Sequence, residues 1–252
     1  MPLLRRRIHA APLKLLRTAT RSPAGLGAAF VNAAAEAEVH SPWFEPRHWH
    51  ALGAVVGTHA GRGTTLAFEH AARGYVLRHY CRGGLMSRIN HDSYLWLGEA
   101  HTRPLAELKL TMLLHDAGLP VPRPVAARYE RSGPLYRADI ITEYLPQTAT
   151  LAERLDAGEL GLPTWAAIGR CIRRFHDYGL CHADLNAHNI LLRGDEEVFL
   201  IDFDRASRRS KAGLWRDANL ARLRRSLDAL EDGRAERRFD DTQWQCLLAS
   251  WL

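Results

Sequence analysis

The stretch His182-Ala-Asp184-Leu-Asn-Ala-His-Asn189, followed thirteen residues later by Asp202 in Leu200-Ile-Asp-Phe-Asp204, decides the fold that we expect. Kinases need one carboxylate to orient the acceptor hydroxyl. They also need an amide oxygen and a second carboxylate to hold Mg²⁺ on the nucleotide phosphates. Asp184 is spaced as the catalytic base, and Asn189 and Asp202 as the metal ligands. The pattern therefore predicts a phosphoryl-transfer site that uses ATP and Mg²⁺.

The spacing of these residues has a physical reason. A tight catalytic loop would place Asp184 and Asn189 on one rim, and a short hairpin from Ile190 to Leu200 would return Asp202 beside them, so that hard oxygen ligands converge on one cation. An Asx-rich turn between two apolar strands is the structural alternative, but this spacing is far more specific than a lone triplet. His182 and His188 invite a zinc interpretation, which we reject because the ligand spacing typical of zinc is absent and oxygen ligands suit Mg²⁺. We expect His182 to order the catalytic loop by hydrogen bonding.

Composition indicates a globular protein whose positive charge is confined to one end. Of 252 residues, 46% are hydrophobic and 25% charged, which is ordinary for a chain with a real core. Residues 1–35 hold six of the 34 basic residues and no acid, which leaves 28 basic against 28 acidic residues elsewhere. The net charge of +6 therefore gives no reason to expect a nucleic-acid partner.

We assign residues 1–40 to a basic N-terminal arm. Its leucines and cations suit a peripheral arm on an anionic inner-membrane surface, while a disordered tail and an organellar transit peptide are open alternatives. No apolar run approaches the roughly 18 residues needed to span a bilayer. The four cysteines contain no CxxC pair, which favours a reduced, cytosolic protein.

Residues 41–146 read as the N-lobe of a kinase. Strands at 53–57 and 64–68 would flank a turn in which Gly61 and Gly63 let backbone N–H groups approach phosphate oxygens, although a plain hairpin turn is the alternative. On the next strand, Arg78 would reach the α and β phosphates. Glu107, in a helix expected over 102–117, would pair with Arg78, unless it is only a solvated helix acid.

The chain then turns from strand to helix. A stiff, proline-rich connector at 120–124 leads to a strand at 139–144, where a two-lobed kinase has its hinge and where the backbone of Glu143 and Leu145 would hydrogen-bond adenine. Residues 147–252 would form the C-lobe, with helices near 165–175 and within 214–252. The fold class that we predict is α+β, a two-lobed protein-kinase-like fold with an antiparallel N-lobe sheet plus one helix and a mainly helical C-lobe.

The chain also resembles a known family. The catalytic stretch, together with Gly61-Arg-Gly-Thr-Thr65, Val76-Leu-Arg-His-Tyr80, Arg82-Gly-Gly84 and Tyr94-Leu-Trp-Leu-Gly98, is similar to bacterial 3-deoxy-D-manno-octulosonic acid (Kdo) kinases over roughly 40–230. The resemblance implies an ATP-dependent kinase that phosphorylates the 4-hydroxyl of Kdo on a Kdo-bearing lipid A precursor. It also implies a peripheral protein at the cytoplasmic face of the inner membrane, acting in lipopolysaccharide core assembly.

Departures from the wider kinase pattern leave other functions open. Arg78 stands where most kinases have lysine, Asp204 replaces a glycine, and no Ala-Pro-Glu follows. These features favour a constitutive small-molecule kinase over a signalling kinase. The alternatives are an aminoglycoside-type or other sugar phosphotransferase and a nucleotide-binding pseudokinase scaffold. An acidic acceptor would need cations near the cleft, and the candidates by position are Arg82, Arg88, Arg205, Arg208 and Arg209.

Overall fold

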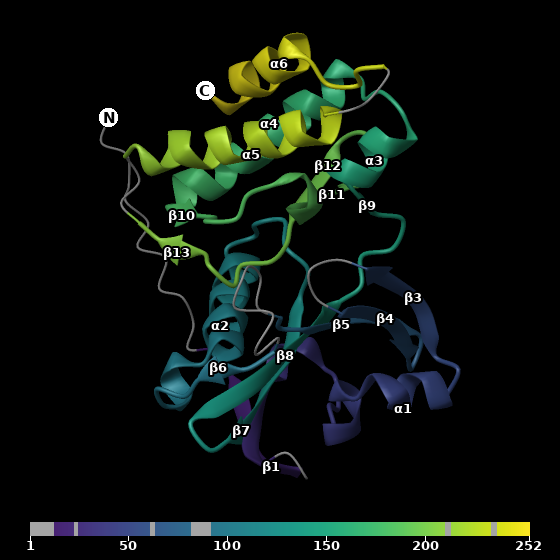
Figure 1. The fold of residues 1–252 in the computed structure, drawn as a ribbon, viewed down its shortest axis with the longest axis vertical. Coiled ribbons are helices and arrows are strands. Elements are labelled where there is room, and N and C mark those ends of the chain that lie inside the picture. Colours follow the sequence, from purple (N-terminus) through teal and green to yellow (C-terminus); the bar gives the residue numbers. More distant parts are fainter. Residues whose placement is uncertain (1–12, 23–24, 61–63, 82–91, 210–212, 233–235) are drawn as a thin grey trace, which may run out of the picture. The chain divides into compact units, whose positions relative to one another are not determined.

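The computed structural model describes residues 13–22, 25–60, 64–81, 92–209, 213–232 and 236–252. The chain divides into two compact units (Figure 1). One consists of Met1–Gly118 with Arg123–Glu143, and the other of Leu119–Pro122 with Tyr144–Leu252. The predicted lobe boundary after residue 146 therefore lies three residues earlier. The proline-rich connector is divided between the units: the Pro120 carbonyl accepts from the Leu200 N–H at 3.0 Å in the second unit, and the Arg123 carbonyl accepts from the Glu143 N–H at 2.9 Å in the first.

The N-terminal unit is built on an antiparallel sheet. Its strands follow the order β1-β2-β7-β8-β5-β4-β3, and β6 also pairs with β8. The strands predicted at 53–57, 64–68 and 139–144 are present with slightly different bounds. The eight strands are β1 (Leu15–Ser22), β2 (Gly25–Asn32), β3 (Val55–Ala60), β4 (Thr64–His70), β5 (Arg73–His79), β6 (Tyr94–Leu95), β7 (Pro124–Ser132) and β8 (Leu135–Glu143).

Side chains alternate across this sheet, so each strand contributes to two cores. On one face, Tyr80 joins Leu105, Leu108 and Met112 of α2 (Arg103–Asp116) in a buried cluster. On the other face, Leu77 packs with aromatic residues of η2 (Ser41–Phe44) and α1 (Pro46–Ala51). The helix predicted over 102–117 is therefore the one that covers the Arg78 side of the sheet.

The arm predicted over residues 1–40 is wrong from residue 15 onward. Residues 15–32 form the β1–β2 hairpin, and β2 pairs with β7 inside the sheet. Gly27 permits this pairing, because a Cβ there would lie 2.0 Å from the Tyr129 carbonyl oxygen. Arg17, taken as a membrane-facing cation, instead forms an ion pair with Glu99 at 2.9 Å. Residues 1–12 lie outside the described part of the chain.

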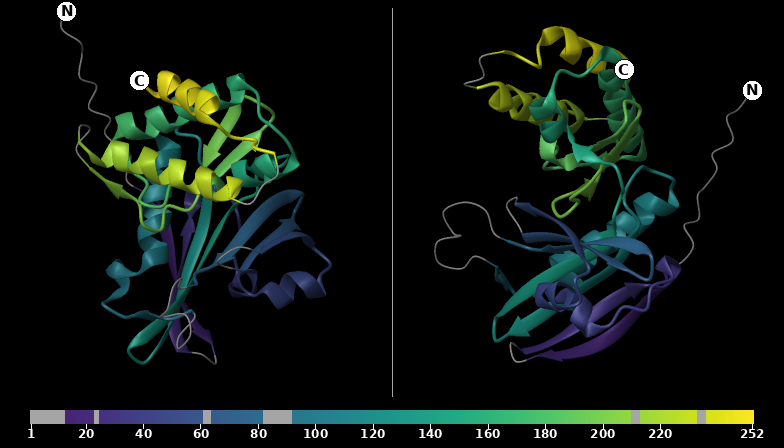
Figure 2. Two further views of the ribbon diagram at one scale, coloured as in Figure 1. Left: turned by 45° about the horizontal axis from the view of Figure 1, so that its top comes forward. Right: turned by 90° about the vertical axis from the view of Figure 1, so that its right-hand side faces the viewer.

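Helices dominate the second unit, as predicted. In α4, Trp165, Ile168, Ile172 and Phe175 are buried at helical spacing. α4 lies against α6, and Figure 2 shows the two helices in teal-green and yellow. The helices are α3 (Leu151–Ala157), α4 (Leu162–Tyr178), α5 (Trp215–Glu231) and α6 (Asp241–Trp251).

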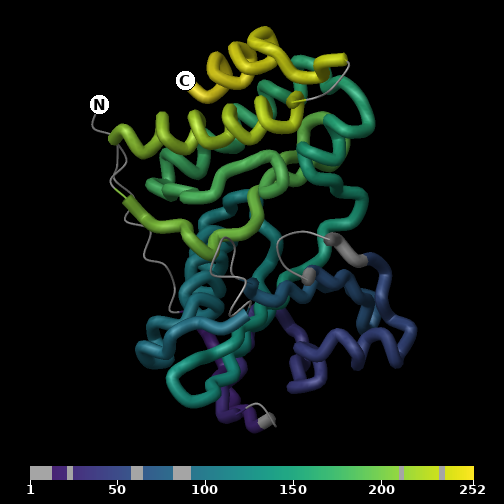
Figure 3. Tube along the Cα trace, in the orientation of Figure 1, coloured from purple at the N-terminus to yellow at the C-terminus, as the bar shows by residue number. Residues whose placement is uncertain are grey.

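Short strands accompany these helices and carry the loop of interest. They are β9 (Ala149–Thr150), β10 (Leu180–Cys181), β11 (Ile190–Arg193), β12 (Glu197–Leu200) and β13 (Ser207–Arg208). Figure 3 traces this stretch, from β10 through the hairpin to β13, in green. Within the described residues, no helix is both long and apolar enough to cross a bilayer.

Candidate active site

Two side-chain amides fix the backbone of the loop that carries Asp184. The Asp184 carbonyl accepts hydrogen bonds from Asn189 Nδ2 at 2.8 Å and from Asn186 Nδ2 at 2.9 Å. Asn186 also caps the 3₁₀ turn η5 (Ala187–Asn189), because its Oδ1 accepts from the His188 N–H. The Asp184 side chain remains 39% exposed. A rigid loop therefore presents an accessible carboxylate, which is the arrangement that a general base requires.

The β11–β12 hairpin brings Asp202 back to this loop, as the spacing predicted. Ile190 pairs with Leu200, and just beyond this pair the Ile201 N–H donates to the Asn189 carbonyl at 3.1 Å. Asp202 is the next residue, and its φ of +64° lies in the left-handed region that residues with a Cβ seldom adopt. Such a backbone persists only where its surroundings enforce it, and such strain is concentrated at functional sites.

His182 ties the loop to the segment that holds Asp202. Its Nε2 lies 2.9 Å from the Ile201 carbonyl oxygen, which can only accept, so this nitrogen carries the proton. The ring is 2% exposed, and burial lowers the pKa of His182 although Asp184 and Asp202 oppose the shift. A neutral histidine therefore makes the hydrogen bonds expected of a residue that orders the loop.

Sequence reasoning missed the contribution of α5 to this loop. Asn219 Oδ1 accepts from the His182 N–H at 3.0 Å, and Ser226 Oγ accepts from the Ala187 N–H at 3.1 Å. Between them, Arg222 Nη1 lies 3.6 Å from Asp184 Oδ1. The spacing of residues 219, 222 and 226 is the signal for a common helix face, but it does not reveal which loop the face meets.

In the N-terminal unit, the predicted pair of Arg78 and Glu107 is present. Arg78 Nη2 lies 2.6 Å from both carboxylate oxygens of Glu107, and the Tyr80 hydroxyl donates to the same carboxylate. The Arg78 guanidinium also stacks 4.7 Å from the centre of the Tyr80 ring. The Glu107 side chain is 5% exposed, so Glu107 is not a solvated helix acid. Contact of Arg78 with phosphate stays a prediction.

The structure describes only some of the remaining residues that the sequence predicted for the site. Gly61, Gly63, Arg82 and Arg88 lie outside the described residues. The Glu143 N–H donates to the Arg123 carbonyl, and the Leu145 carbonyl accepts from Thr148 Oγ1. Three further predicted cations, at positions 205, 208 and 209, are exposed.

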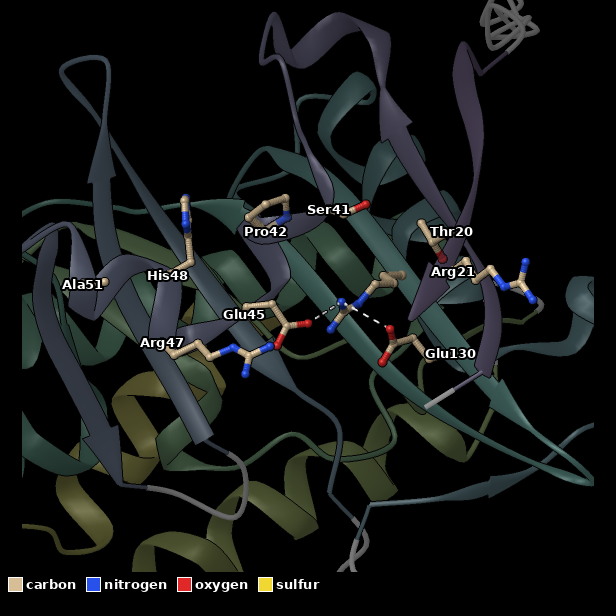
Figure 4. A pocket seen from close by; sticks show the side chains of 10 residues that line it. Thr20, Arg21, Ser41, Pro42, Glu45, Arg47, His48, Ala51 and Glu130 are labelled. Carbon is tan, nitrogen blue, oxygen red and sulfur yellow. Dashed lines mark hydrogen bonds and ion pairs between the residues drawn. The ribbon is translucent and has the colours of Figure 1, made fainter. Parts of the chain in front are cut away.

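A cavity of about 640 Å³ in the N-terminal unit holds none of the predicted site residues (Figure 4). Arg128 is nearly buried there, and it pairs with Glu45 at 2.8 Å and Glu130 at 3.5 Å. A third ion pair joins Arg128 to Asp139 at 2.8 Å, and Asp139 in turn lies 2.7 Å from His79. Arg128 and the carboxylates around it are thus committed to one another in ion pairs, so we assign the cavity no part in the chemistry.

Comparison with known proteins identifies the kinase class. The family model described as lipopolysaccharide kinase (Kdo/WaaP) family matches residues 47–251. The chain belongs to the lipopolysaccharide kinase (Kdo/WaaP) family. It is therefore a phosphotransferase that uses ATP, and the Kdo kinase resemblance noted from the sequence is confirmed.

Several relatives of this kinase are named 3-deoxy-D-manno-octulosonic acid kinase. The protein of Stenotrophomonas maltophilia strain K279a is 44% identical over 226 residues, covering 90% of this chain and 89% of the relative. That of Photobacterium profundum is 41% identical over 204 residues, covering 81% and 86%. That of Haemophilus influenzae strain 86-028NP is 40% identical over 222 residues, covering 85% and 91%.

Proposed function

We propose that this kinase transfers the γ-phosphoryl group of ATP to the 4-hydroxyl of Kdo on a Kdo-bearing lipid A precursor. Relatives that cover most of the chain are named Kdo kinases. The observation that carries the proposal is the accessible Asp184 carboxylate, which is 39% exposed on a loop of kinase spacing where two side-chain amides donate to the Asp184 main-chain carbonyl. The reaction would belong to the assembly of the lipopolysaccharide core.

The proposed reaction gives Asp184 the role of positioning residue and late proton acceptor. Phosphoryl transfer passes through a loose transition state, so catalysis consists mostly of alignment and charge stabilisation. Asp184 would hydrogen-bond the acceptor hydroxyl and aim its oxygen along the line of transfer. The amides of Asn186 and Asn189 would fix the backbone from which that carboxylate projects.

Asn189 and Asp202 suit the metal that this chemistry needs. Asn189 is buried, and because its Nδ2 is committed to the Asp184 carbonyl, its Oδ1 is the atom left for a cation. An amide oxygen and a carboxylate are hard donors of the kind that Mg²⁺ prefers. Bound Mg²⁺ would supply positive charge to the phosphates of ATP.

Residues outside this loop would complete the nucleotide-binding site. Arg78, held by Glu107, would bind the α and β phosphates, and the backbone around Gly61 and Gly63 would cover them. The backbone of Glu143 and Leu145 would hydrogen-bond adenine.

A lipid-anchored acceptor also implies a place for the protein. We assign it to the cytoplasmic face of the inner membrane as a peripheral protein, with the anionic membrane surface and the Kdo-bearing precursor as partners and no nucleic acid. Arg5, Arg6 and Arg7 are the cations proposed to favour anionic lipids.

Mass spectrometry of the acceptor tests the proposal. The protein, Mg²⁺ and ATP should add one phosphate to Kdo-bearing lipid A precursor and none to lipid A that lacks Kdo. NMR of the released sugar should place the phosphate on the 4-hydroxyl. Transfer to aminoglycosides or other sugars without transfer to the Kdo lipid would reject the acceptor and retain the kinase.

A further inference from the structure

We infer that Arg222 binds the carboxylate of the acidic sugar while Asp184 receives the hydroxyl that is phosphorylated. This inference rests on the proposed function, because it concerns how the same site recognises its acceptor. Arg222 is not among the cations that the sequence suggested, and its position follows from the packing of α5 against the catalytic loop.

Two hydrogen-bonded residues of α5, of which Asn219 is buried, fix Arg222 opposite Asp184. Asn219 is 4% exposed and accepts from His182 on one side of Asp184, while Ser226 accepts from Ala187 on the other. Arg222 lies between them on the same helix face, so the Cα of Arg222 has little freedom to move relative to the loop. The packing of α5 against the loop therefore sets the position of the guanidinium near Asp184.

The contact between Arg222 and Asp184 leaves most of the guanidinium available. Its 3.6 Å separation is longer than a hydrogen bond, which lies between about 2.7 and 3.2 Å. The Arg222 side chain is 48% exposed, and among the described residues no hydrogen bond holds it. By contrast, Arg224 of the same helix is held at 2.8 Å by both Asp228 and Asp241. Arg222 thus keeps donors for a second, external carboxylate.

The chemistry of the acceptor places its carboxylate in this region. In Kdo, the carboxyl group is attached to C2, only two ring carbons from the 4-hydroxyl, so a sugar whose hydroxyl meets Asp184 must bring its carboxylate close to the same side chain. Asp202 and Asp204 follow on the neighbouring segment, and without a cation these like charges would repel an acidic sugar. Arg222 offsets that repulsion and supplies a planar fork that matches a carboxylate.

The test compares Kdo-bearing lipid A precursor with its Kdo methyl ester, which removes the negative charge and keeps the 4-hydroxyl. For the wild type, esterification should lower kcat/KM by about 10- to 100-fold, as expected for the loss of one charged hydrogen bond. Arg222→Gln should lower kcat/KM for the acid by a similar factor, mainly by raising the KM for the acceptor. The kcat/KM values of this variant for the acid and the ester should then be nearly equal. The KM for ATP should not change.

Two variants complete the design. Arg225→Gln removes an exposed arginine from the same helix and should keep the preference of the wild type for the acid. Arg222→Lys keeps the charge and loses the fork, so it should retain part of the preference, and it carries the test if Arg222→Gln fails to fold.

The outcomes separate this inference from the proposed function. If Arg222→Gln lowers kcat equally for acid and ester and leaves their ratio unchanged, Arg222 only supports Asp184 and the inference is overturned while the proposed function stands. If the wild type transfers no phosphate to the Kdo lipid, the proposed function fails and the inference fails with it.

Discussion

At the scale of single residues, substitution of Asp184 and of Asp202 should impair different steps of the reaction. Asp184→Asn should lower kcat by about 10²-fold or more, because it removes a base that contributes roughly 10²–10⁴-fold, while ATP binding survives. Asp202→Asn should also weaken Mg²⁺-dependent nucleotide binding. Titration of Mg·ATP against both variants, followed by single-turnover kinetics, separates the two roles. Near-full turnover of Asp184→Asn with the Kdo lipid would show that Asp184 is not the base.

Glu107 offers a second residue-scale prediction with a close control. Glu107→Gln removes the carboxylate that pairs with Arg78, so the KM for ATP should rise by about tenfold, the effect of 1.4 kcal/mol. Glu99 has the same types of partner at a more exposed position, because it holds Arg17 at 2.9 Å and accepts from the Tyr129 hydroxyl at 2.7 Å. Glu99→Gln should leave the KM for ATP unchanged. Equal effects of the two substitutions would mean that Glu107 acts only through the stability of the unit.

At the scale of elements, the contact of α4 with α6 depends on Gly169. A Cβ at this position would lie 2.2 Å from the Leu247 carbonyl oxygen and 3.2 Å from Ser250 Cβ. Gly169→Ala should therefore force the helices apart and destabilise the protein by about 1–3 kcal/mol. Gly158→Ala is the control, since nothing lies within 4 Å of its Cβ position. Thermal unfolding should show a lower midpoint only for Gly169→Ala.

His176 of α4 makes the same helix pair sensitive to acid. It is 1% exposed, its Nδ1 accepts from Trp251 Nε1 at 2.9 Å, and burial lowers its pKa to about 4. Between about pH 6.5 and pH 4, His176 is protonated in the unfolded chain but not in the folded chain. The free energy of unfolding therefore falls as the pH falls. The loss should reach roughly 2–4 kcal/mol.

Denaturant unfolding at pH 7 and pH 5 measures this effect. The lowered pKa of buried His182 acts in the same direction. The hydrogen bond with Asp139 raises the pKa of His79, so its stabilisation is fully present below pH 6.5 and is lost only as the pH rises through the folded-state pKa. His176→Gln should be less stable at pH 7 but lose less on acidification. An unchanged pH dependence would remove His176 as the cause.

At the scale of the whole molecule, local patterns predicted the geometry of the loop and hairpin that carry Asp184 and Asp202, whereas most pairings between distant segments were missed. One loop and one hairpin hold Asp184, Asn189 and Asp202, so their spacing in the sequence was enough to predict that they lie near one another. The Arg78–Glu107 pair was predicted from kinase order. The sheet position of β2 was missed because its partner Glu130 lies about a hundred residues from Gly27, and Arg222 was missed because helix periodicity does not name the opposing surface.

Truncation of the N-terminus tests the membrane-arm interpretation separately from the structural role of the β1–β2 hairpin. Deletion of residues 1–12 keeps the β1–β2 hairpin, so the thermal midpoint should not change. If Arg5, Arg6 and Arg7 bind anionic lipid, this deletion should reduce sedimentation with anionic vesicles, most at low salt, since each cation contributes about 1 kcal/mol near the surface. Deletion of residues 1–32 also removes buried Phe30 and exposes the edge of β7, so it should cause unfolding or aggregation. Equal vesicle binding by the full chain and the 1–12 deletion would reject the membrane arm, and a stable, active 1–32 deletion would show that the hairpin is dispensable for the fold.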